Sequence, residues 1–379
     1  MENMRNLNPT EMKLLHYMGK NPEFTNEQLA ALLGLRNPPY VSALKAQLEE
    51  KQYFVGPYYQ TDYGRIFKNK VRKTVAIVLF EQSYEFIFSL LKNIGCFSYL
   101  YPIEERFFKS YMVGLFDSDT EAIKKIFEYL KRKGVIFHYE LYIQDYQTRV
   151  IPPTFLLNSE EASFDPLLDN LLKDVESPDL SFGAFEGITL SEPEQKLITF
   201  FEMGVTVLTQ IMENQKLQGN FYTYAEWKAA KERLVQHEVV QQVYDIFPFP
   251  AVDCSYFFLF LSAQTLDDTK RVLFNFGRGS RLRKMVFLWR PYKTEKTYGV
   301  VYCISHPEFT IRLLRQLDNY EEIEDKRLFM LRKKIPLWRA LWEGKSVSME
   351  YYDPSSCTLY YPYTEYFEKI KTYVEVHPW

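Results

Sequence analysis

Cysteine is scarce in this sequence, and its four copies are scattered. They form no C-x-x-C pair and lie far apart, at Cys96, Cys254, Cys303 and Cys357. This spacing offers no zinc site and favours a reducing compartment over a disulfide-stapled scaffold. No apolar run is long enough to span a bilayer, and no N-terminal hydrophobic stretch resembles a signal peptide. We therefore expect a cytoplasmic protein that does not enter a membrane.

Familiar catalytic and metal-binding motifs are also missing. The five histidines are dispersed and form neither H-x-x-x-H nor H-E-x-x-H. The glycine pair in Gly277-Arg-Gly279-Ser280 lacks the G-x-x-x-x-G-K-[ST] form of a phosphate loop, so a simple turn is favoured. These absences predict no catalytic residue, no metal ion and no cofactor. Basic residues near this turn could form an anion-binding patch or a solvated surface: Arg278, Arg281, Arg283 and Lys284.

The bulk composition indicates a globular protein of several domains. The chain has 379 residues, of which 46% are hydrophobic and 25% charged, so two to four domains are expected. Aromatic residues make up 17%, which implies cores or interfaces rich in rings. The net charge of −3 excludes a histone-like polycation.

The segment Thr25–Phe54 predicts a helix-turn-helix. Thr25 suits an N-cap, Gly34 permits the left-handed residue that ends a helix, and Asn37 can cap a second helix. Apolar residues recur at helical spacing on both sides of the turn. Two short helices joined in this way form the DNA-reading motif whose second helix enters the major groove, although an ordinary helical hairpin has the same pattern.

The residues after this motif predict a wing and a basic strap. Gly56-Pro57 is a turn pair between two short strand-like runs. Five basic residues then follow within nine positions: Arg65, Lys68, Lys70, Arg72 and Lys73. Such a run is either a solvated linker or a set of phosphate contacts.

The remainder of the chain predicts a second kind of unit and then a repeat of both. Val75–Phe80 is a buried strand that opens a β-α-β-β-α-β order, which is ferredoxin-like. The helical pattern then returns at Leu190–Leu197, and Tyr256–Leu261 repeats the strand. We therefore predict an α+β fold, a tandem repeat of winged helix-turn-helix and ferredoxin-like βαββαβ units. For the second helical unit, the pattern predicts no glycine-containing turn and an insertion of extra residues at Val205–Gly219.

The expected domains follow from these patterns. They are a winged helix-turn-helix at 1–74, a ferredoxin-like domain at 75–150, an acidic linker at 151–188, a second, degenerate helix-turn-helix-like domain at 189–250, a second ferredoxin-like domain at 251–331, and a C-terminal extension at 332–379. Within the linker, residues 158–187 hold eight acidic side chains and one basic side chain.

The order of the predicted units, a helix-turn-helix followed by a ferredoxin-like unit, resembles the Lrp/AsnC family of transcription regulators, and so do several residues. The matching features are Leu29-A-A-L-L-G-Leu35 and the Leu48-Glu49-Glu50-Lys51 run before a short strand. The resemblance implies a regulator that is not an enzyme, with double-stranded DNA as partner, an amino-acid-like effector, and a homodimer or an intramolecular pseudo-dimer. The expected DNA contacts are Arg36, Asn37, Tyr40, Ser42, Lys45, Arg65, Lys68, Arg72 and Lys73.

Two other functions remain open at this point. Siroheme decarboxylases are similar to Lrp/AsnC proteins and also occur as paired halves, which fits a duplicated chain. Such an enzyme would need basic and histidine side chains around a large tetrapyrrole. A protein-interaction scaffold that does not bind DNA is the third possibility. The second helical unit is acidic, and an acidic surface repels phosphate, so we expect DNA contact from the first unit alone.

Overall fold

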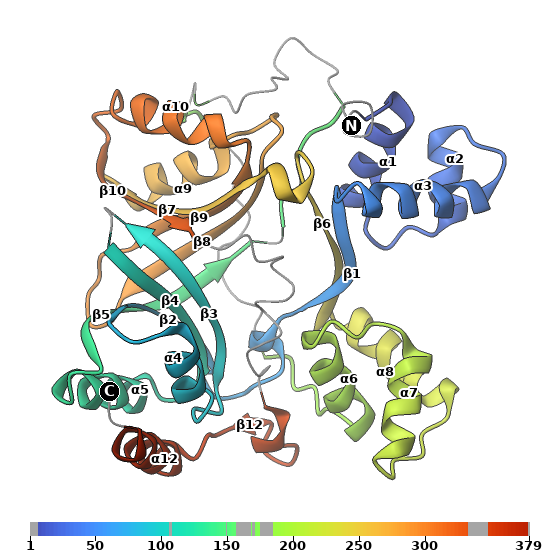
Figure 1. Ribbon diagram of the computed structural model, residues 1–379. Helices are drawn as coiled ribbons and strands as arrows, with labels where there is room; N and C mark the ends of the chain where they lie inside the picture. Colours follow the sequence, from blue (N-terminus) through green and yellow to red (C-terminus); the bar gives the residue numbers. More distant parts are fainter. Residues whose placement is uncertain are drawn as a thin grey trace.

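The computed structural model describes most of the chain. It covers residues 7–105, 108–148, 150–156, 168, 171–174, 185–332 and 348–377. Much of the predicted acidic linker and the first part of the predicted C-terminal extension lie outside the described residues. Within them, helices and strands are both abundant, and the α+β class is confirmed (Figure 1).

The first helical unit contains α1 (Pro9–Lys20), α2 (Asn26–Leu33) and α3 (Pro38–Glu50). Its helices begin where the capping residues stand in the sequence. Asn8 and Glu11 form a capping box at α1, and Thr25 forms another with Gln28 at α2. Gly34 ends α2 in the left-handed conformation, as the sequence predicts.

The second helical unit also has three helices, α6 (Glu192–Glu202), α7 (Leu208–Leu217) and α8 (Tyr224–Gln236). The predicted insertion at Val205–Gly219 is wrong, because α7 occupies most of this segment. Val207 stands at the N-cap of α7 and makes no side-chain cap, so the usual start signal is missing. Gly219 follows the helix with a φ of +85°, so a glycine turn is present here too.

Each helical unit continues into a long strand, and these two strands pair with each other. They are β1 (Phe54–Thr61) and β6 (Val240–Ile246), which run antiparallel with Tyr59 opposite Gln242. The predicted wing is therefore wrong. Gly56-Pro57 does not turn the chain but lies at an irregularity within β1, because β1 finds its partner in the other half of the chain. Figure 1 shows this ribbon between the helical units and the main sheet.

Eight further strands form one closed sheet, with four strands from each half of the chain, while β11 (Tyr352–Asp353) and β12 (Thr358–Leu359) pair separately. The first half supplies β2 (Arg72–Phe80), β3 (Phe97–Glu105), β4 (Phe108–Asp117) and β5 (Ile136–Gln147), and the second supplies β7 (Ser255–Ala263), β8 (Arg283–Pro291), β9 (Tyr298–Ser305) and β10 (Ile323–Leu331). The order is β10-β3-β4-β2-β5-β8-β9-β7, and β7 pairs with β10 to close it. The halves therefore join at two seams, β5 with β8 and β10 with β3.

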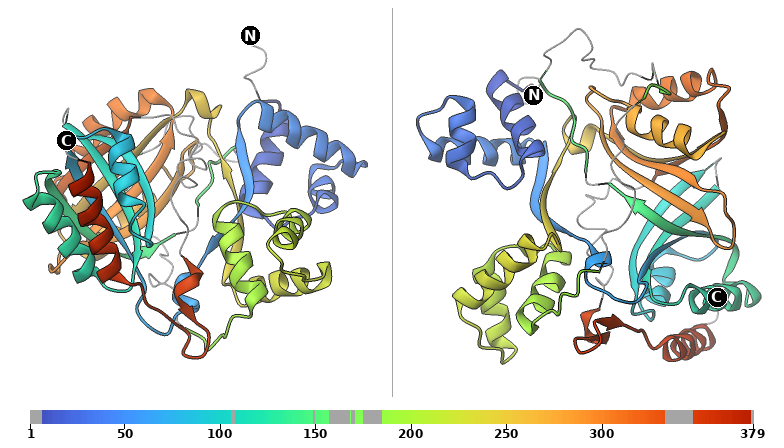
Figure 2. Two further views of the ribbon diagram at one scale, coloured as in Figure 1. Left: turned by 60° about the horizontal axis from the view of Figure 1, so that its bottom comes forward. Right: turned by 180° about the vertical axis from the view of Figure 1, so that it is seen from behind.

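Helices cover the outside of this closed sheet. Those of the first half are α4 (Tyr84–Leu91) and α5 (Thr120–Arg132), and those of the second are α9 (Leu266–Asn275) and α10 (Pro307–Leu317) (Figure 2). Aliphatic side chains dominate under the helices of the second half. The interior is instead rich in rings, including Tyr99, Phe258, Phe260 and Trp289. Because successive residues of a strand face opposite sides, one sheet supplies both cores.

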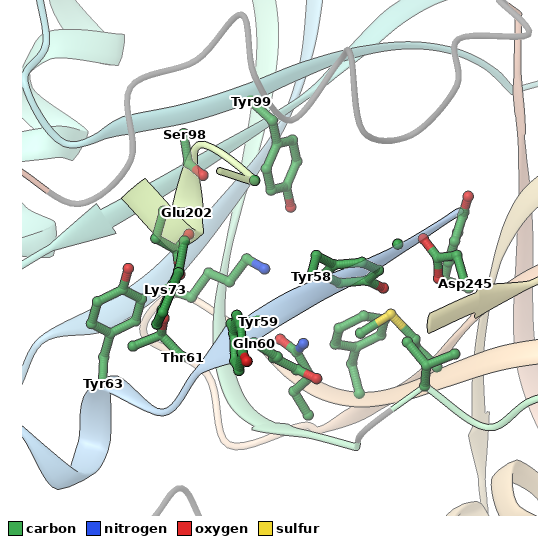
Figure 3. Close-up of a pocket in the computed structure, with 18 of the residues that line it drawn as sticks. Tyr58, Tyr59, Gln60, Thr61, Tyr63, Lys73, Ser98, Tyr99, Glu202 and Asp245 are labelled. Atoms are coloured by element: carbon green, nitrogen blue, oxygen red, sulfur yellow. The ribbon is translucent and has the colours of Figure 1, made fainter. Parts of the chain in front are cut away.

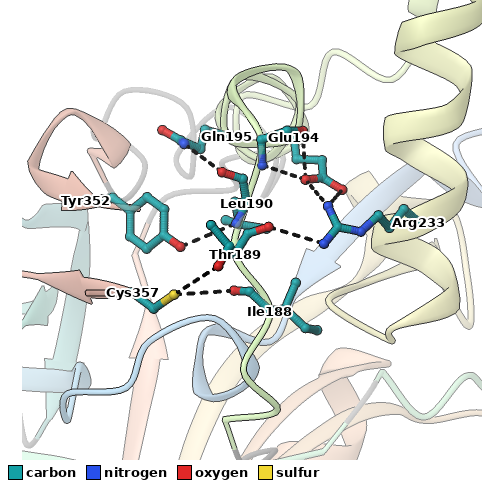
Figure 4. A network of polar contacts seen from close by, with 9 residues as sticks. Ile188, Thr189, Leu190, Glu194, Gln195, Arg233, Tyr352 and Cys357 are labelled. Carbon is teal, nitrogen blue, oxygen red and sulfur yellow. Dashed lines mark hydrogen bonds and ion pairs between the residues drawn. The ribbon is translucent and has the colours of Figure 1, made fainter. Parts of the chain in front are cut away.

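The C-terminal segment connects parts that are distant in sequence. Its helix α12 (Tyr363–Val376) packs on α4 and α5. The Asn69 side chain both donates to and accepts from the backbone of Leu359, at 2.8 and 2.9 Å. Tyr352 Oη accepts from the backbone N–H of Leu190, and Cys357 Sγ donates to the Ile188 carbonyl (Figure 4). The segment thus ties the start of α6 to the first half of the sheet.

In the part of the chain that the structure describes, no helix is both long enough and apolar enough to cross a lipid bilayer.

Candidate functional site

A cavity of about 480 Å³ lies between β1 and the inner face of the closed sheet (Figure 3). Strand β1 contributes the whole stretch Val55–Thr61, and both halves of the sheet supply the opposite wall. The end of α6 reaches the cavity through Phe201, Glu202 and Gly204. The helical unit that the sequence analysis takes to be degenerate therefore supplies part of this site.

Aromatic rings are prominent in the cavity wall. Those that line it are Tyr58, Tyr59, Tyr63, Tyr99, Tyr101, Phe116, Phe201, Phe258, Phe287, Trp289 and Tyr302. Several are stacked or tilted against one another, with ring centroids 4.5 Å apart for Tyr99 and Tyr101 and 4.2 Å apart for Tyr59 and Phe201. Ring pairs of this kind present broad, polarisable faces. The volume is within the usual range for small-molecule and cofactor sites, about 300–1,000 Å³.

Arg283, at the start of β8, places a buried cation in the wall. It is 1% exposed, and its Nη2 donates to Asp245 on β6. Its Nε and Nη1 have no hydrogen-bond partner among the described residues, and neither has the hydroxyl of Tyr302. The guanidinium also lies 5.6 Å from the centroid of the Tyr302 ring. A buried donor without an acceptor costs roughly 1–3 kcal/mol, so this end of the cavity is suited to an acceptor from a ligand.

Lys73, near the start of β2, supplies a second cation. Figure 3 places Lys73 and Asp245 on opposite sides of Tyr58. The Lys73 ammonium lies 5.4 Å from the ring centroid of Tyr99 and 5.6 Å from that of Phe116. Within the described ranges its Nζ makes no hydrogen bond and no ion pair. The ammonium nitrogen therefore lies near two aromatic rings, and its N–H groups can donate hydrogen bonds to a ligand.

Glu202 is the acidic neighbour of Lys73. Burial lowers the pKa of Lys73 to about 8, although the Glu202 charge opposes this shift. Burial also raises the pKa of Glu202, against the opposing effects of the Thr61 and Tyr63 hydroxyls and of Lys73. Desolvation disfavours the charged form of each group, so both give up their charge more readily than they would in water.

A second, smaller cavity of about 220 Å³ adjoins this end of the site. Lys73, Tyr63 and Gln147 belong to the walls of both cavities. Amide side chains are prominent in its lining, namely Gln60, Gln144, Gln147 and Gln241. The smaller cavity is therefore richer in amide side chains than the larger one, and both cavities share Lys73 and Gln147.

The basic cluster near the turn at Gly277 separates into different environments. Arg283 faces the cavity, whereas its neighbour Lys284 points to the other side of β8. Lys284 is 3% exposed, and its ammonium donates to three backbone carbonyls at the end of α9, at distances of 2.6 to 2.9 Å. Burial lowers the pKa of Lys284 to about 7. Successive side chains of a strand point to opposite faces of the sheet, so Arg283 lines the cavity while Lys284 contacts the end of α9.

The residues predicted to contact DNA lie in three different settings. On and before α3, Arg36, Asn37 and Tyr40 are exposed. Ser42 accepts a hydrogen bond from Asn26 at 2.8 Å, and the Lys45 ammonium lies 5.7 Å from the centroid of the Tyr244 ring. Burial lowers the pKa of Lys45. None of these five residues lines the cavity.

The predicted basic strap is also divided. Arg65 forms ion pairs with Glu186 at 2.6 Å and Glu238 at 2.7 Å. These carboxylates lie just before and just after the helices of the second helical unit, so Arg65 binds to that unit. Lys68 is exposed, and Arg72 lies at the first position of β2, opposite Asp117. Of the nine predicted residues, only Lys73 lines the cavity.

The cavity residues carry little signal in the sequence. In the sequence, Tyr58, Tyr99 and Trp289 look like ordinary strand residues. Glu202 looks like the last residue of an amphipathic helix. The high aromatic content and the basic cluster around Arg283 were the available signals. In the described residues, no group of three or more His, Cys, Asp or Glu side chains could hold a metal ion, and no histidine is among the residues that line the cavity.

The solved structures similar to this chain include two that cover nearly all of it. No family model matches it, and no curated protein matches its sequence. One solved structure is that of the siroheme decarboxylase NirDL in co-complex with an iron-uroporphyrin III analogue, with 10% identity, a TM-score of 0.48, and coverage of 97% of this chain and 99% of that chain. The other is the siroheme decarboxylase NirDL, with 10% identity, a TM-score of 0.47 and the same coverage.

These findings overturn the prediction of a DNA-binding transcription regulator that is not an enzyme. Both structures matched over nearly the full chain are decarboxylases, which are enzymes. The contacts in this chain agree with the correction, because Arg65 is occupied by carboxylates and Lys73 faces a cavity. Two members of the predicted strap are thus unavailable to phosphate. Double-stranded DNA and the amino-acid effector are withdrawn as partners. At 10% identity, function has to be argued from this chain's own cavity.

Proposed function

We propose that this chain is a tetrapyrrole decarboxylase. It would bind a large conjugated ring with carboxylate side chains, such as siroheme, and release carbon dioxide from one of them. The observation that carries the proposal is the ring-lined cavity with Lys73 and Arg283 in its wall. The sequence resemblance had left this class open, and the two decarboxylase structures name the same reaction.

The aromatic wall supports a flat, conjugated ligand. Tyr99, Tyr101 and Trp289 line the cavity from the sheet, and Tyr58 and Tyr59 line it from β1. A planar ring between such walls gains apolar burial together with favourable ring–ring geometry. No histidine is among the residues that line the described walls, so we expect the ligand to be held by ring contacts and by its carboxylates.

The two cations support a ligand that carries several negative charges. Arg283 keeps two nitrogens without a partner, and Lys73 has no acceptor among the described residues. Hydrogen bonds between charged groups are about twice as strong as those between neutral groups. A tetrapyrrole with carboxylates around its rim can reach both cations at once, whereas a small monocarboxylate can reach only one.

Glu202 is our candidate for the proton donor. Loss of carbon dioxide from an acetate side chain leaves an electron pair on the methylene carbon, where a conjugated ring can delocalise it. A proton must then bond to that carbon, so each turnover consumes one proton and releases one carbon dioxide. Burial raises the pKa of Glu202, which keeps its carboxyl group protonated to higher pH. After Glu202 has given up its proton, the nearby Lys73 would stabilise the Glu202 carboxylate.

The proposal is tested by ligand binding and product analysis. Iron-uroporphyrin III and siroheme are titrated into the protein while the Soret absorption is recorded, and the products are examined by mass spectrometry under reducing and non-reducing conditions. We expect both ligands to bind, and siroheme to lose the mass of carbon dioxide. Glu202→Gln should bind siroheme normally but convert it about a hundredfold more slowly, within the usual range for a lost general acid.

Two further variants make this experiment specific. Tyr302→Phe removes only a hydroxyl beside Arg283 and should weaken ligand binding severalfold. Lys228→Met, on the outer surface of α8, is the matched control and should behave like the wild type, because Lys228 is 61% exposed and away from the cavity lining. Absence of any Soret change with either ligand would refute the proposal. A cytoplasmic location is part of the proposed function. The four buried cysteines, which form no disulfide within the described structure, support that location.

A further inference from the structure

A chain of hydrogen bonds fixes which end of the Gln147 amide faces the cavities. The indole Nε1 of Trp289 can only donate, and it donates to Gln144 Oε1 at 3.1 Å. Gln144 must therefore use its Nε2 as a donor, and this atom lies 2.9 Å from Gln147 Oε1. The oxygen of Gln147 is thereby occupied. Its Nε2, which carries two N–H groups, is left as the end presented to a ligand.

This orientation follows from the chemistry of the first donor in the chain. An amide oxygen and an amide nitrogen can exchange places with little change in shape, but an indole nitrogen cannot become an acceptor. Gln144 is 2% exposed, so water does not compete freely for its oxygen. Trp289 thus acts at a distance as a positioning residue for Gln147.

Lys73 presents further donors at the same place. It shares with Gln147 the walls of both cavities, and its ammonium finds no acceptor in the described part of the chain. The junction between the cavities therefore offers N–H groups from an ammonium and from an amide. A carboxylate is an acceptor-only group with two oxygens, whereas a carboxamide would turn its own donors toward one of them.

We propose that the junction at Lys73 and Gln147 is a carboxylate-binding subsite, and that the glutamine-lined cavity receives one carboxylate side chain of the ligand whose ring lies in the larger cavity. The identity of the ring rests on the function proposed above, but the subsite itself rests on these donors. The N–H donors of the subsite stabilise negative charge on the carboxylate oxygens. Because decarboxylation would move that charge onto carbon, this stabilisation of the bound carboxylate favours retention of that carboxyl group over its loss. The side chain that points into the smaller cavity is therefore one that the product keeps.

A pair of small aromatic probes tests the subsite without a tetrapyrrole. Naphthoate and naphthamide have nearly the same shape, and they differ in the group that would lie at the junction. Affinities are measured by isothermal titration calorimetry. We expect the wild type to prefer naphthoate by about tenfold or more, as charge-assisted hydrogen bonds imply. The preference should be lost in Lys73→Met and reduced in Gln147→Leu, while naphthamide affinity changes little.

The positioning role of Trp289 has its own variant. Trp289→Phe keeps an aromatic ring but removes the donor, which frees the Gln144 amide to turn and lets Gln147 present either end. The naphthoate preference should therefore fall severalfold, although Lys73 and Gln147 are both intact. Naphthamide affinity reports any change in cavity shape. Lys68→Met is the control, because Lys68 is exposed and absent from both cavity linings, and it should keep the full preference.

The possible results separate the two proposals. Iron-uroporphyrin III is titrated into the same preparations, and circular dichroism verifies that each variant is folded. Binding of naphthoate that depends on Lys73 and Gln147, without binding of iron-uroporphyrin III, supports the subsite and overturns the proposed function. Binding of iron-uroporphyrin III to a wild type that does not prefer naphthoate overturns the subsite alone. A preference that survives in folded Lys73→Met and Gln147→Leu also overturns it.

Discussion

Raising the pH should release a carboxylate ligand from this protein, because the Lys73 ammonium loses its proton in an unusual range. Burial lowers the pKa of Lys73 from its ordinary value of 10.5 to about 8. With that value, Lys73 is roughly nine-tenths charged at about pH 7 and roughly one-tenth charged at about pH 9. A ligand that binds only the charged form should therefore lose about tenfold in affinity between these two conditions.

The assay is titration calorimetry with naphthoate across this interval, with naphthamide as the uncharged reference. Naphthoate stays ionised throughout, since carboxylic acids titrate several units lower. The nearby tyrosines do not interfere, because burial raises the pKa of Tyr63 and of Tyr99. Lys73→Arg keeps its charge at all these pH values, so its affinity should be almost independent of pH.

Glu202 provides a second check on the sign of this effect. Its negative charge raises the pKa of Lys73, in opposition to burial. Glu202→Gln should therefore move the midpoint of the affinity loss to lower pH. An affinity for naphthoate that is constant between about pH 7 and about pH 9 in the wild type, or a midpoint near the ordinary lysine pKa, would refute the reasoning that places Lys73 in a desolvated site.

Three other changes have defined outcomes. Gly114→Ala should weaken naphthamide and naphthoate binding alike by about tenfold, because an added Cβ would overlap the ring of Tyr99, which lines the cavity. Lys284→Met should lower the free energy of unfolding by about 2–4 kcal/mol in urea titrations, since three carbonyls at the end of α9 lose their donor. Burial raises the pKa of Asp117 from 3.8 to about 6, so the folded state binds the extra proton between these values and stability falls as pH rises through them. Asp117→Asn should remove this pH dependence and, above pH 6, stabilise the protein by up to about 3 kcal/mol in the same assay, as a shift of two units implies.

The sequence predicted those parts of the fold that depend on local patterns. Val75–Phe80 lies within β2 as expected, and the capping residues of α1 and α2 mark where those helices begin. The repeated pattern also led to the tandem α+β architecture. The wing failed because Gly56-Pro57 is a turn signal in isolation, and nothing local shows that β1 pairs with a strand more than 180 residues away.

The site was hidden for a similar reason, since charge in a sequence does not reveal its partners. Arg65 and Lys73 belong to one basic run, but Arg65 pairs with carboxylates 121 and 173 residues away, whereas Lys73 points into a cavity. Glu202 enters that cavity only because α6 ends beside β1. The inward or outward direction of Arg283 and Lys284 depends on the register of β8, which is set by strands from both halves.

The closed sheet also bears on how the two halves can change over evolutionary time. A sheet closed between two identical subunits would repeat every substitution on both sides, and its binding site would treat the two ends of a ligand alike. Here both seams, β5 with β8 and β10 with β3, lie within one polypeptide. Each half can therefore acquire its own residues, and one wall holds Lys73 while the other holds Arg283. An asymmetric molecule can then be held in a single orientation, so that one of its side chains is consistently distinguished from the rest.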